Sequence, residues 1–431
     1  MARLNMLKIG WNRTHEGGRA RRIPPEQELR RSVLACMLWE NQFYEDGVEI
    51  AARIRELVPK VDAAAVAALA IEAREKMKLR HAPLYLVREM ARHATHRAAV
   101  SATLARVIQR ADELAEFLAI YWKDKREPLS AQAKKGLAIA FRKFDEYALA
   151  KYDRAGRVRL RDVLFLCHAK PRDADQAQLW KRLVAGELAT PDTWEVALSA
   201  GGDKRVAWER LLSENKLGAL ALLRNLRNLK DAQVDERLVA RALTGIKTDR
   251  VLPFRFIAAA RHAPQWDEAL ERAMFASVAE QPKLAGKTVL LVDVSGSMIH
   301  PLSARSEMLR ADAAYGLAAL VREVAEQVSV YTFSDHLAAV PARRGFALRD
   351  ALDASQPHSG TYLYGALKQL SEPYDRLIVI TDEQTRDDVG EPAGKAYVIN
   401  VASYKHGVGY GKWMHIDGWS EAVVDYIREQ E

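Results

Sequence analysis

The pattern of apolar positions changes near residue 282, and the two sides of this point predict different kinds of structure. Through residues 26–281, apolar side chains recur every three or four positions, which is the period of an amphipathic helix. We expect helices at 131–150, 161–168, 190–201 and 216–229, among others. In the third of these, Thr190 is placed to cap the helix and Pro191 to occupy its first turn. Short loops between helices with one apolar stripe favour an α-solenoid, and a compact bundle is the alternative.

Beyond residue 282, apolar runs short enough for strands alternate with helical stretches. The strand-like runs cover residues 288–292, 328–333, 376–381 and 396–401, and the helical stretches cover residues 305–325, 362–371 and 420–429. This alternation predicts a mostly parallel sheet covered by helices, with residues 337–341 as a hairpin edge strand. We therefore predict a helical domain over residues 1–281 and an α/β domain over residues 282–431.

The segment KTVLLVDVSGSM at residues 287–298 carries the strongest chemical signal of the chain. Its apolar run suits a strand buried on both faces of a sheet, and it ends in Asp293, Ser295 and Ser297. One carboxylate and two hydroxyls at alternate positions are hard oxygen ligands for a small divalent cation. They stand at the carboxyl edge, where open α/β sheets bind their ligands.

Two later segments complete this set of oxygen atoms. Thr361 precedes a helical stretch, and Asp382 follows a second buried run. Two carboxylates balance one divalent ion, and with hydroxyls and water they approach the octahedral shell of Mg²⁺, leaving one position for an outside oxygen. The arrangement resembles the metal-ion-dependent adhesion site of von Willebrand factor A domains, which implies a divalent metal, Mg²⁺ being the expected ion. Its ligands would be Asp293, Ser295, Ser297, Thr361 and Asp382.

Enzymatic interpretations of the same residues are weaker. A phosphatase of the D-x-D type would need a carboxylate where Ser295 stands, and no G-x-S-x-G is centred on Ser295 or Ser297. Gly286-Lys287-Thr288 resembles the end of a phosphate-binding loop, but Gln281 takes the place of its first glycine and a strand follows instead of a helix. We therefore predict a protein that is not an enzyme and has no catalytic residues.

Charge is distributed unevenly between the two predicted domains. The chain carries 65 Lys and Arg against 57 Asp and Glu, a net charge of +8. Residues 1–281 hold 50 of these basic and 37 of these acidic side chains, so the positive excess lies in the helical part and the remainder is acidic. A basic first part favours nucleic acid as its partner, although solvated Arg-rich helix faces would produce the same count.

Cysteine usage and the apolar runs bear on the compartment. Cys36 and Cys167 cannot form a disulfide framework and are typical of a reducing compartment. The first residues lack the apolar core of a secretory signal, and the longest apolar run, 63–71, is too short to span a membrane. We expect a soluble cytoplasmic protein without a membrane partner.

Several segments, in their order along the chain, resemble the Ro autoantigen family, whose helical part is called the TROVE module. They are Asn12 with Gly17-Gly18, KYDRAGRVRLRDVLFLCHAKP at 151–171, ALLRNL at 221–226, LPFRF at 252–256 and the DVSGSM strand end. The likeness covers nearly the whole length. It implies a monomeric ring of HEAT-like helical repeats, followed by a von Willebrand factor A domain that helps to close the ring.

The resemblance also implies RNA partners. Family members bind small structured non-coding RNAs, called Y RNAs, on the outer ring surface, and they accept single-stranded 3′ ends of misfolded RNAs in the central hole. An exoribonuclease that receives the RNA is a further candidate partner. Lys and Arg on a rigid scaffold give salt-sensitive and largely sequence-tolerant affinity for phosphates, which suits such partners.

The segment that matches the family's Y-RNA contacts is 151–171, where Lys151 and His168 stand at matching positions. Neighbouring basic positions become Asp153 and Ala155, so adjacent arginines would have to restore the charge. The predicted RNA-binding residues are Lys151, Arg154, Arg157, Arg161, His168 and Lys170. We therefore predict an RNA-binding scaffold of RNA quality control. The alternative is a protein-interaction adaptor whose metal grips a partner's carboxylate.

Overall fold

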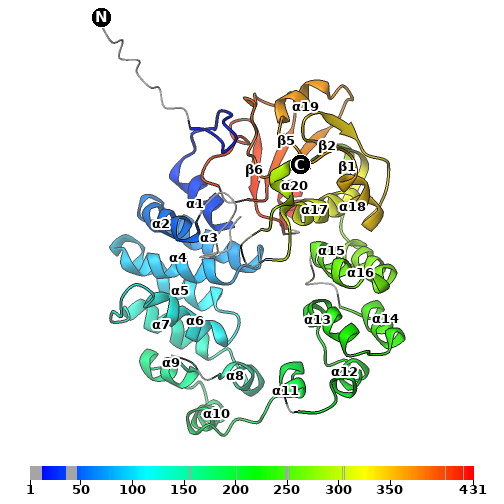
Figure 1. The fold of residues 1–431 in the computed structure, drawn as a ribbon. Coiled ribbons are helices and arrows are strands. Elements are labelled where there is room, and N and C mark those ends of the chain that lie inside the picture. The colour runs from blue at the N-terminus through cyan, green and yellow to red at the C-terminus, as the bar shows by residue number, and fades with distance from the viewer. Residues whose placement is uncertain are drawn as a thin grey trace, which may run out of the picture.

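The structure is a computed structural model in which a helical part and a sheet domain together form a ring (Figure 1). It describes residues 12–34, 46–154, 156, 158–199, 201–247, 251, 253–302, 304, 306–402, 404–420 and 422–431. Within these ranges, no helix combines the length and the apolar character needed to cross a membrane.

The helical part is divided into two arms by its hydrophobic cores. The first arm contains α1 (Pro25–Leu34), α2 (Gly47–Leu57), α3 (Ala63–Glu75), α4 (His81–Arg92), α5 (Arg97–Val107), α6 (Asp112–Tyr121), α7 (Ala131–Phe141), α8 (Glu146–Tyr152), α9 (Leu160–Cys167) and α10 (Ala174–Ala185). The second arm contains α11 (Trp194–Ser199), α12 (Lys204–Ser213), α13 (Ala219–Asp231), α14 (Glu236–Thr244), α15 (Pro253–His262) and α16 (Asp267–Val278). One buried apolar cluster follows the first arm, and another runs from α12 to α16 and continues into the sheet domain.

Local sequence explains where many of these helices begin. Asp62 caps α3 by accepting from the backbone N–H of Ala64 at 2.8 Å, and Asp145 caps α8 by accepting from that of Ala148 at 2.8 Å. Each such cap satisfies a backbone donor that has no partner inside the helix and stabilises the helix by about 1 kcal/mol. Short 3-10 turns, η1 (Val58–Lys60), η2 (Ala94–His96), η3 (Pro264–Trp266) and η4 (Gly296–Ile299), connect or extend the elements.

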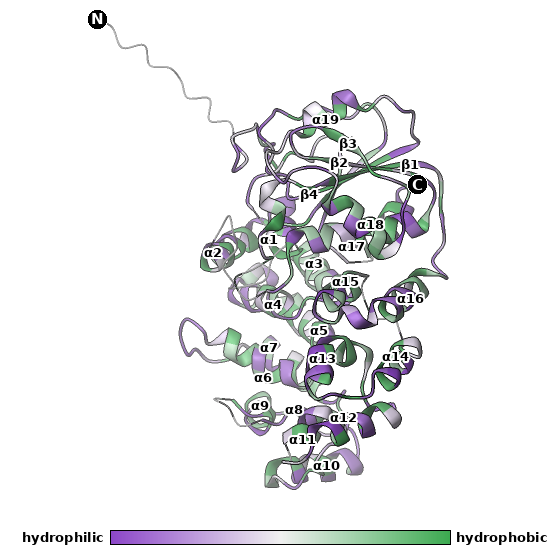
Figure 2. Cartoon of the chain, turned by 45° about the vertical axis from the view of Figure 1, so that its right-hand side comes forward, coloured by the Kyte–Doolittle hydropathy of each residue, from purple (hydrophilic) through white to green (hydrophobic). Residues whose placement is uncertain are grey.

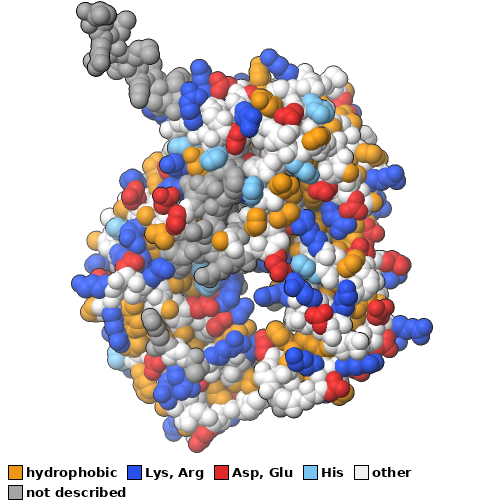
Figure 3. Space-filling model, in the orientation of Figure 1, with side chains coloured by type: hydrophobic (Ala, Val, Ile, Leu, Met, Phe, Trp, Pro, Cys, Tyr) orange, Lys and Arg blue, Asp and Glu red, His pale blue; other side chains and the backbone are white. Residues whose placement is uncertain are grey.

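The two arms face each other across an opening. The helices of the first arm descend on one side of Figure 1, α11 lies near the bottom, and α12 to α16 return on the other side to the sheet domain. The opening persists when all atoms are drawn (Figure 3). The structure therefore confirms the expected helical ring and excludes the compact bundle.

The sheet domain contains β1 (Leu284–Asp293), β2 (Ala325–Phe333), β3 (Leu337–Ala339), β4 (Arg376–Thr381), β5 (Ala396–Asn400) and β6 (Met414–Asp417), in the spatial order β3-β2-β1-β4-β5-β6. All neighbouring pairs are parallel except β2 and β3, which form the expected antiparallel hairpin. This order places β1 and β4 side by side at the centre of the sheet. Their carboxyl ends therefore meet at one edge.

Side chains alternate across this sheet, as the strand period requires. Leu290 and Val292 of β1 enter the core that includes α17 (Arg310–Val324), α18 (Gly345–Asp353) and α20 (Ala422–Glu429). Val289 and Leu291 enter a second core with α19 (Leu363–Gln369) on the opposite face. Figure 2 shows α17 and α18 on the side of the sheet that faces the helical arms, and α19 on the outer side.

Some predicted boundaries were wrong for local reasons. The segment 131–150 is divided into α7 and α8, because the Asp145 cap starts a new helix. The segment 190–201 becomes helical only at Trp194. There the Thr193 hydroxyl accepts from the backbone N–H of Val196 at 3.3 Å, so Thr190 does not cap and Pro191 precedes the helix. In the sheet domain, α17 begins at residue 310, not 305, and the prediction missed α18 and β6.

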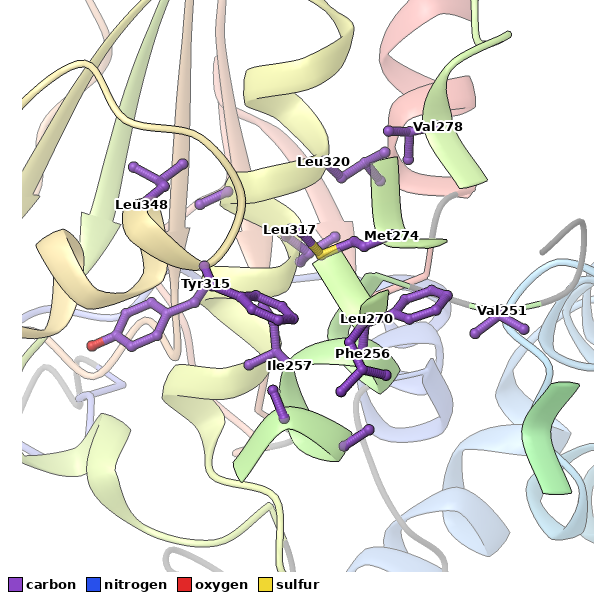
Figure 4. Close-up of a cluster of buried hydrophobic side chains, with 14 of the residues drawn as sticks. Val251, Phe256, Ile257, Leu270, Met274, Val278, Tyr315, Leu317, Leu320 and Leu348 are labelled. Atoms are coloured by element: carbon purple, nitrogen blue, oxygen red, sulfur yellow. The ribbon is translucent and has the colours of Figure 1, made fainter. Parts of the chain in front are cut away.

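The second arm joins the sheet domain through apolar side chains, and we call this contact the apolar seam. Its members come from α15, α16, α17 and α18 and include Phe256, Ile257, Leu270, Met274, Val278, Tyr315, Leu317, Leu320 and Leu348. Figure 4 shows these side chains gathered between the helices. A Cβ on Gly316 would lie 2.7 Å from the Cβ of Phe254, so the close approach of α17 to α15 requires glycine at that position.

The first arm joins the sheet domain differently, through buried charges, and we call this contact the ionic seam. It consists of Arg31 of α1 with Glu383, Tyr410, His415 and Asp417 of the sheet domain. The Arg31 guanidinium and the Glu383 carboxylate form an ion pair, and both side chains are fully buried. His415 Nε2 lies 2.9 Å from the same carboxylate, and His415 Nδ1 lies 3.5 Å from Asp417.

The Glu383 carboxylate is fully hydrogen-bonded in this setting. It also accepts from the backbone N–H groups of Val408 and Gly409, at 3.1 and 2.6 Å. A Cβ on Gly407 would lie 2.5 Å from the Glu383 carboxylate and 2.6 Å from the Arg31 guanidinium, so this turn can pass the ion pair only as glycine. Complete hydrogen bonding is what makes a buried ion pair tolerable.

The segment before α1 extends the same contact. The Thr14 hydroxyl and the Gly18 backbone N–H both donate to the carbonyl of Thr385, at 2.6 and 3.3 Å. A Cβ on Gly18 would lie 2.5 Å from the backbone carbonyl oxygen of Asp387. One loop after β4 therefore holds both the N-terminal segment and, through Glu383, helix α1.

Candidate metal centre and nucleic-acid interface

Strand β1 brings the first three predicted metal ligands together. Asp293 is its last residue and is fully buried. One carboxylate oxygen of Asp293 accepts from the backbone N–H of Ser295 at 2.9 Å, and the other accepts from the Thr381 hydroxyl at 2.6 Å. The hydroxyl oxygens of Ser295 and Ser297 lie 3.2 Å apart. Two hydroxyls thus stand side by side beyond a buried carboxylate.

The other two predicted ligands lie on the neighbouring loops. Asp382 directly follows β4 and is fully buried. The loop that carries Thr361 contacts both other segments, because the Gly296 N–H donates to the Ser359 carbonyl at 3.0 Å and the Arg386 N–H donates to the Thr361 carbonyl at 2.9 Å. All three predicted segments therefore converge at one edge of the sheet.

The electrostatics of this edge favour a cation. Burial, followed by the negative charge of Asp382, raises the pKa of Asp293 well above its usual value. Hydrogen bonds from Ser295 and Thr381 act in the opposite direction but do not cancel the shift. Two buried carboxylates that repel each other are stabilised by a positive charge placed between them.

One residue of this edge was missed by the sequence analysis. Arg310, the first residue of α17, is 1% exposed, and its guanidinium lies 3.5 Å from Asp382 and 3.2 Å from the backbone carbonyl of Ser297. Its single positive charge balances one of the two carboxylates. The signal available in the sequence was an arginine at a helix N-terminus, where the helix dipole disfavours a cation.

The residues present fit a hard divalent ion and do not fit zinc. Among the described residues, no group of three or more His, Cys, Asp and Glu side chains is arranged to hold a metal. An ion at this edge would therefore rely on Asp293 and Asp382 together with hydroxyls and water, which is the donor set that Mg²⁺ accepts. Arg310 would compete with it for Asp382.

The predicted RNA contacts lie on α8, on α9 and in the loops at the two ends of α9. Arg154, Arg161, His168 and Lys170 are exposed, and Lys151 is half-buried. The Lys151 ammonium lies 5.7 Å from the ring centroids of both Tyr147 and Tyr152. Arg157 lies outside the described residues.

Two local features decide which charges remain available on this surface. Asp153 pairs with Arg159 at 3.1 Å, so one arginine of the segment is neutralised. His168 ends α9 in the left-handed conformation, with φ 52°. Its backbone N–H donates to the Phe165 carbonyl at 3.3 Å, while its ring stays exposed. His168 is therefore not a buried, internally satisfied histidine.

Comparison with known proteins gives a family match for the later half of the helical part. Residues 174–282 match the family model described as the TROVE domain. The chain is a TROVE-domain protein. Over 87 residues it is 39% and 37% identical to Telomerase protein component 1 of Mus musculus and of Rattus norvegicus. Each alignment covers 18% of this chain and 3% of the relative, so the chain spans only a small part of these relatives' length.

A solved structure shows the same fold over nearly the whole chain. The crystal structure of the Ro (Rsr) protein of Deinococcus radiodurans superposes with a TM-score of 0.62 and 20% sequence identity, covering 93% of this chain and 98% of that one. The predicted resemblance to the Ro and TROVE family is thus confirmed, as is the fold class.

In this TROVE-domain protein, the matched stretch begins at α10 and ends just before β1. The predicted RNA contacts on α8 and α9 lie upstream of that stretch. Their support is therefore the exposure and charge of the side chains, together with the sequence likeness of residues 151–171.

Proposed function

We propose that this TROVE-domain protein is a non-catalytic RNA-binding scaffold. Its outer surface at α8 and α9 takes small structured non-coding RNA, and its central opening takes the single-stranded 3′ ends of misfolded RNA. Membership of the TROVE family supports RNA binding in general. The structured RNA, the misfolded RNA and a role in cytoplasmic RNA quality control are the specific parts of the proposal.

The observation that carries the proposal is the combination of a TROVE domain with an open ring whose helical part holds the whole positive excess of the chain. A rigid ring of positive charge attracts phosphates without reading bases. A narrow opening admits a single strand and excludes folded RNA, which selects RNA by its free end. An exoribonuclease working on RNA held in this way is the corresponding protein partner.

The metal edge has a separate role in this proposal. Mg²⁺ bound by Asp293, Asp382 and the hydroxyls of Ser295, Ser297 and Thr361 would keep one position for an oxygen of a protein partner. The RNA would remain on the helical surfaces. Labelled RNA incubated with the protein and Mg²⁺ should therefore stay intact, and cleavage would show that the chain is an enzyme.

The test is RNA binding measured by fluorescence anisotropy across a range of salt concentrations. Lys151→Ala combined with Arg161→Ala should weaken binding of a structured RNA and lower the slope of log K against log salt by up to about two. The matched control is Arg237→Ala combined with Lys412→Ala, which removes the same charge from exposed positions on α14 and before β6.

The control separates a contact surface from a general field effect. An equal loss in both double variants would mean that α8 and α9 are not the contact surface. Absent or salt-independent RNA binding by the unaltered chain would favour the adaptor function instead.

A further inference from the structure

A cavity on the second arm gathers several arginine side chains. The cavity has a volume of about 610 Å³ and is lined by α13, α15, the segment before α17 and Trp419, which follows β6. Figure 3 shows Lys and Arg side chains beside the central opening, over α13 and α15. The volume lies within the range of small-molecule sites and is ample for one nucleotide.

Four arginines line this cavity against two carboxylates. Arg227 lies 3.2 Å from Glu307, and Arg261 lies 2.7 Å from Asp312, so both carboxylates are already paired. Arg224 and Arg255 are exposed in the cavity wall, and neither makes an ion pair with any residue that the structure describes. Two positive charges are therefore left over at one place.

The surroundings make these two charges costly in the free protein. Arg255 stands in the first turn of α15, where the positive end of the helix dipole repels a cation. The mass of protein around it, followed by the like charge of Arg224, lowers the pKa of Arg255 from its usual value, although solvent still reaches the side chain. A bound anion would remove this repulsion, and the phosphate group matches the planar donors of arginine.

An aromatic side chain also lines the cavity. Trp419 is half-buried and lines the same cavity from the sheet domain. An indole face stacks on any base, whereas arginines bind any phosphate, so the pair of features recognises a nucleotide without reading its sequence.

We propose that Arg224 and Arg255 form a phosphate-binding site and that Trp419 stacks on the attached base, so that the cavity holds one nucleotide unit. The nucleotide comes either from single-stranded RNA entering the ring or from a free nucleotide. The RNA source deepens the proposed function and rests on it, whereas phosphate binding itself does not. An occupant would contact the second arm and the sheet domain at once.

The test uses the full-length chain with Arg224→Gln and Arg255→Gln combined. In the first experiment, a fluorescent oligouridylate of ten nucleotides is titrated at several salt concentrations. The double variant should bind it roughly ten-fold more weakly, with the salt slope reduced by about 0.7 to 1.4, the range for one or two phosphate contacts on a single strand. Arg237→Gln on α14 removes the same charge from an exposed position outside the cavity and should leave binding unchanged.

In the second experiment, inorganic phosphate and uridine monophosphate are added at constant ionic strength while Tm is measured. Both should raise the Tm of the unaltered chain and not that of the double variant. Trp419→Leu should weaken oligouridylate binding by about five-fold or more and leave the inorganic phosphate effect in place. Melting curves without ligand confirm that the variants are folded.

The outcomes separate this site from the proposed function. Loss of the phosphate effect in the double variant supports the site. Loss of oligouridylate affinity in the same variant then names RNA as the source, and retained affinity names a free nucleotide. The site would be overturned, with RNA binding left in place, if the double variant bound oligouridylate as tightly as the unaltered chain and gained as much Tm from phosphate. An unaltered chain that binds phosphate but no RNA would overturn the proposed function alone.

Discussion

The two seams that close the ring use opposite chemistry. The apolar seam shares one hydrophobic core between α15, α16, α17 and the sheet, so the second arm and the sheet domain are continuous. At the ionic seam, the buried apolar residues of the first arm form a cluster of their own, against which Ala422 of the sheet domain packs. The buried Arg31–Glu383 ion pair spans the boundary. Apolar burial tolerates small shifts of position, whereas a buried ion pair is favourable in one geometry only.

We infer from this difference that the apolar seam contributes most of the free energy that holds the ring closed. The ionic seam fixes the relative position in which the first arm and the sheet domain meet. The chain order supports this division. The apolar seam joins elements that follow each other within about a hundred residues, while Arg31 and Glu383 are 352 positions apart. Residues so far apart in the chain are brought together reliably when a buried charge on one of them finds its opposite charge only in the correct arrangement.

The largest expected effect is at Arg31. Arg31→Ala leaves the Glu383 carboxylate buried without the arginine that pairs with it. We expect the free energy for opening the contact between the first arm and the sheet domain to fall by about 3 to 5 kcal/mol. Chemical denaturation with limited proteolysis before α2 measures it. Arg30→Ala is the control, because the Arg30–Glu72 pair is partly exposed and should contribute about 1 kcal/mol or less. Equal effects of the two substitutions would refute the ionic seam.

The apolar seam should respond to a cavity instead. Leu320→Ala removes buried methyl groups between α17 and α16, and we expect a loss of about 2 to 5 kcal/mol that does not change between pH 6 and pH 10 or with salt. The same denaturation measurement checks it. A strong salt dependence of this variant relative to the unaltered chain would show that charges contribute there as well.

The pH dependence should separate the seams further. Asp417 and Glu383 raise the pKa of His415 to about 9 against the opposing effect of burial. Because this folded-state pKa lies above the unfolded value, the stabilisation is complete below about pH 6.5 and is lost as the pH rises through about 9. At about 1.4 kcal/mol per pKa unit, the loss is at most about 3 to 4 kcal/mol. His415→Gln should remove the alkaline fall in Tm, and an unchanged profile would exclude His415 as its cause.

The smallest expected effect concerns the metal edge. Mg²⁺ at about five times its Kd should stabilise the chain by about 1 kcal/mol, and Asp293→Asn should abolish this increment without changing RNA affinity. Arg310→Gln should tighten Mg²⁺ binding, because it removes the competing positive charge near Asp382. Calorimetric titration with MgCl₂ measures both. Magnesium heats that are identical in all three proteins would place the ion elsewhere.

Sequence patterns were sufficient to locate most strands of the sheet. Apolar runs located β4, β5 and the second half of β1 because these strands are buried on both faces, and they located β2 although part of it is exposed. The three chain segments that were expected at the carboxyl edge of the sheet lie together there. The apolar pattern did not predict β6, because Met414-His415-Ile416-Asp417 is short and half polar. Its two charged side chains are satisfied within the ionic seam and by the side chain of Asn400.

The remaining features depend on partners that are distant in the chain. Arg31 in an amphipathic helix looks like a solvated side chain until Glu383 is placed against it. Arg224 and Arg255 were part of segments that signalled the family. That neither pairs with a carboxylate among the described residues appears only when α13 and α15 are packed together. Arg310 likewise acquires a role only when α17 begins beside the metal edge.

The most direct test of the account is RNA binding by the full-length chain over 50 to 300 mM KCl, with and without a magnesium chelator. Because positively charged helical surfaces are proposed to hold the RNA, affinity should fall steeply as salt rises and should not change on chelation. Binding that is absent at low salt, or that disappears with the chelator, would contradict the claim that the helical ring binds RNA independently of the metal edge.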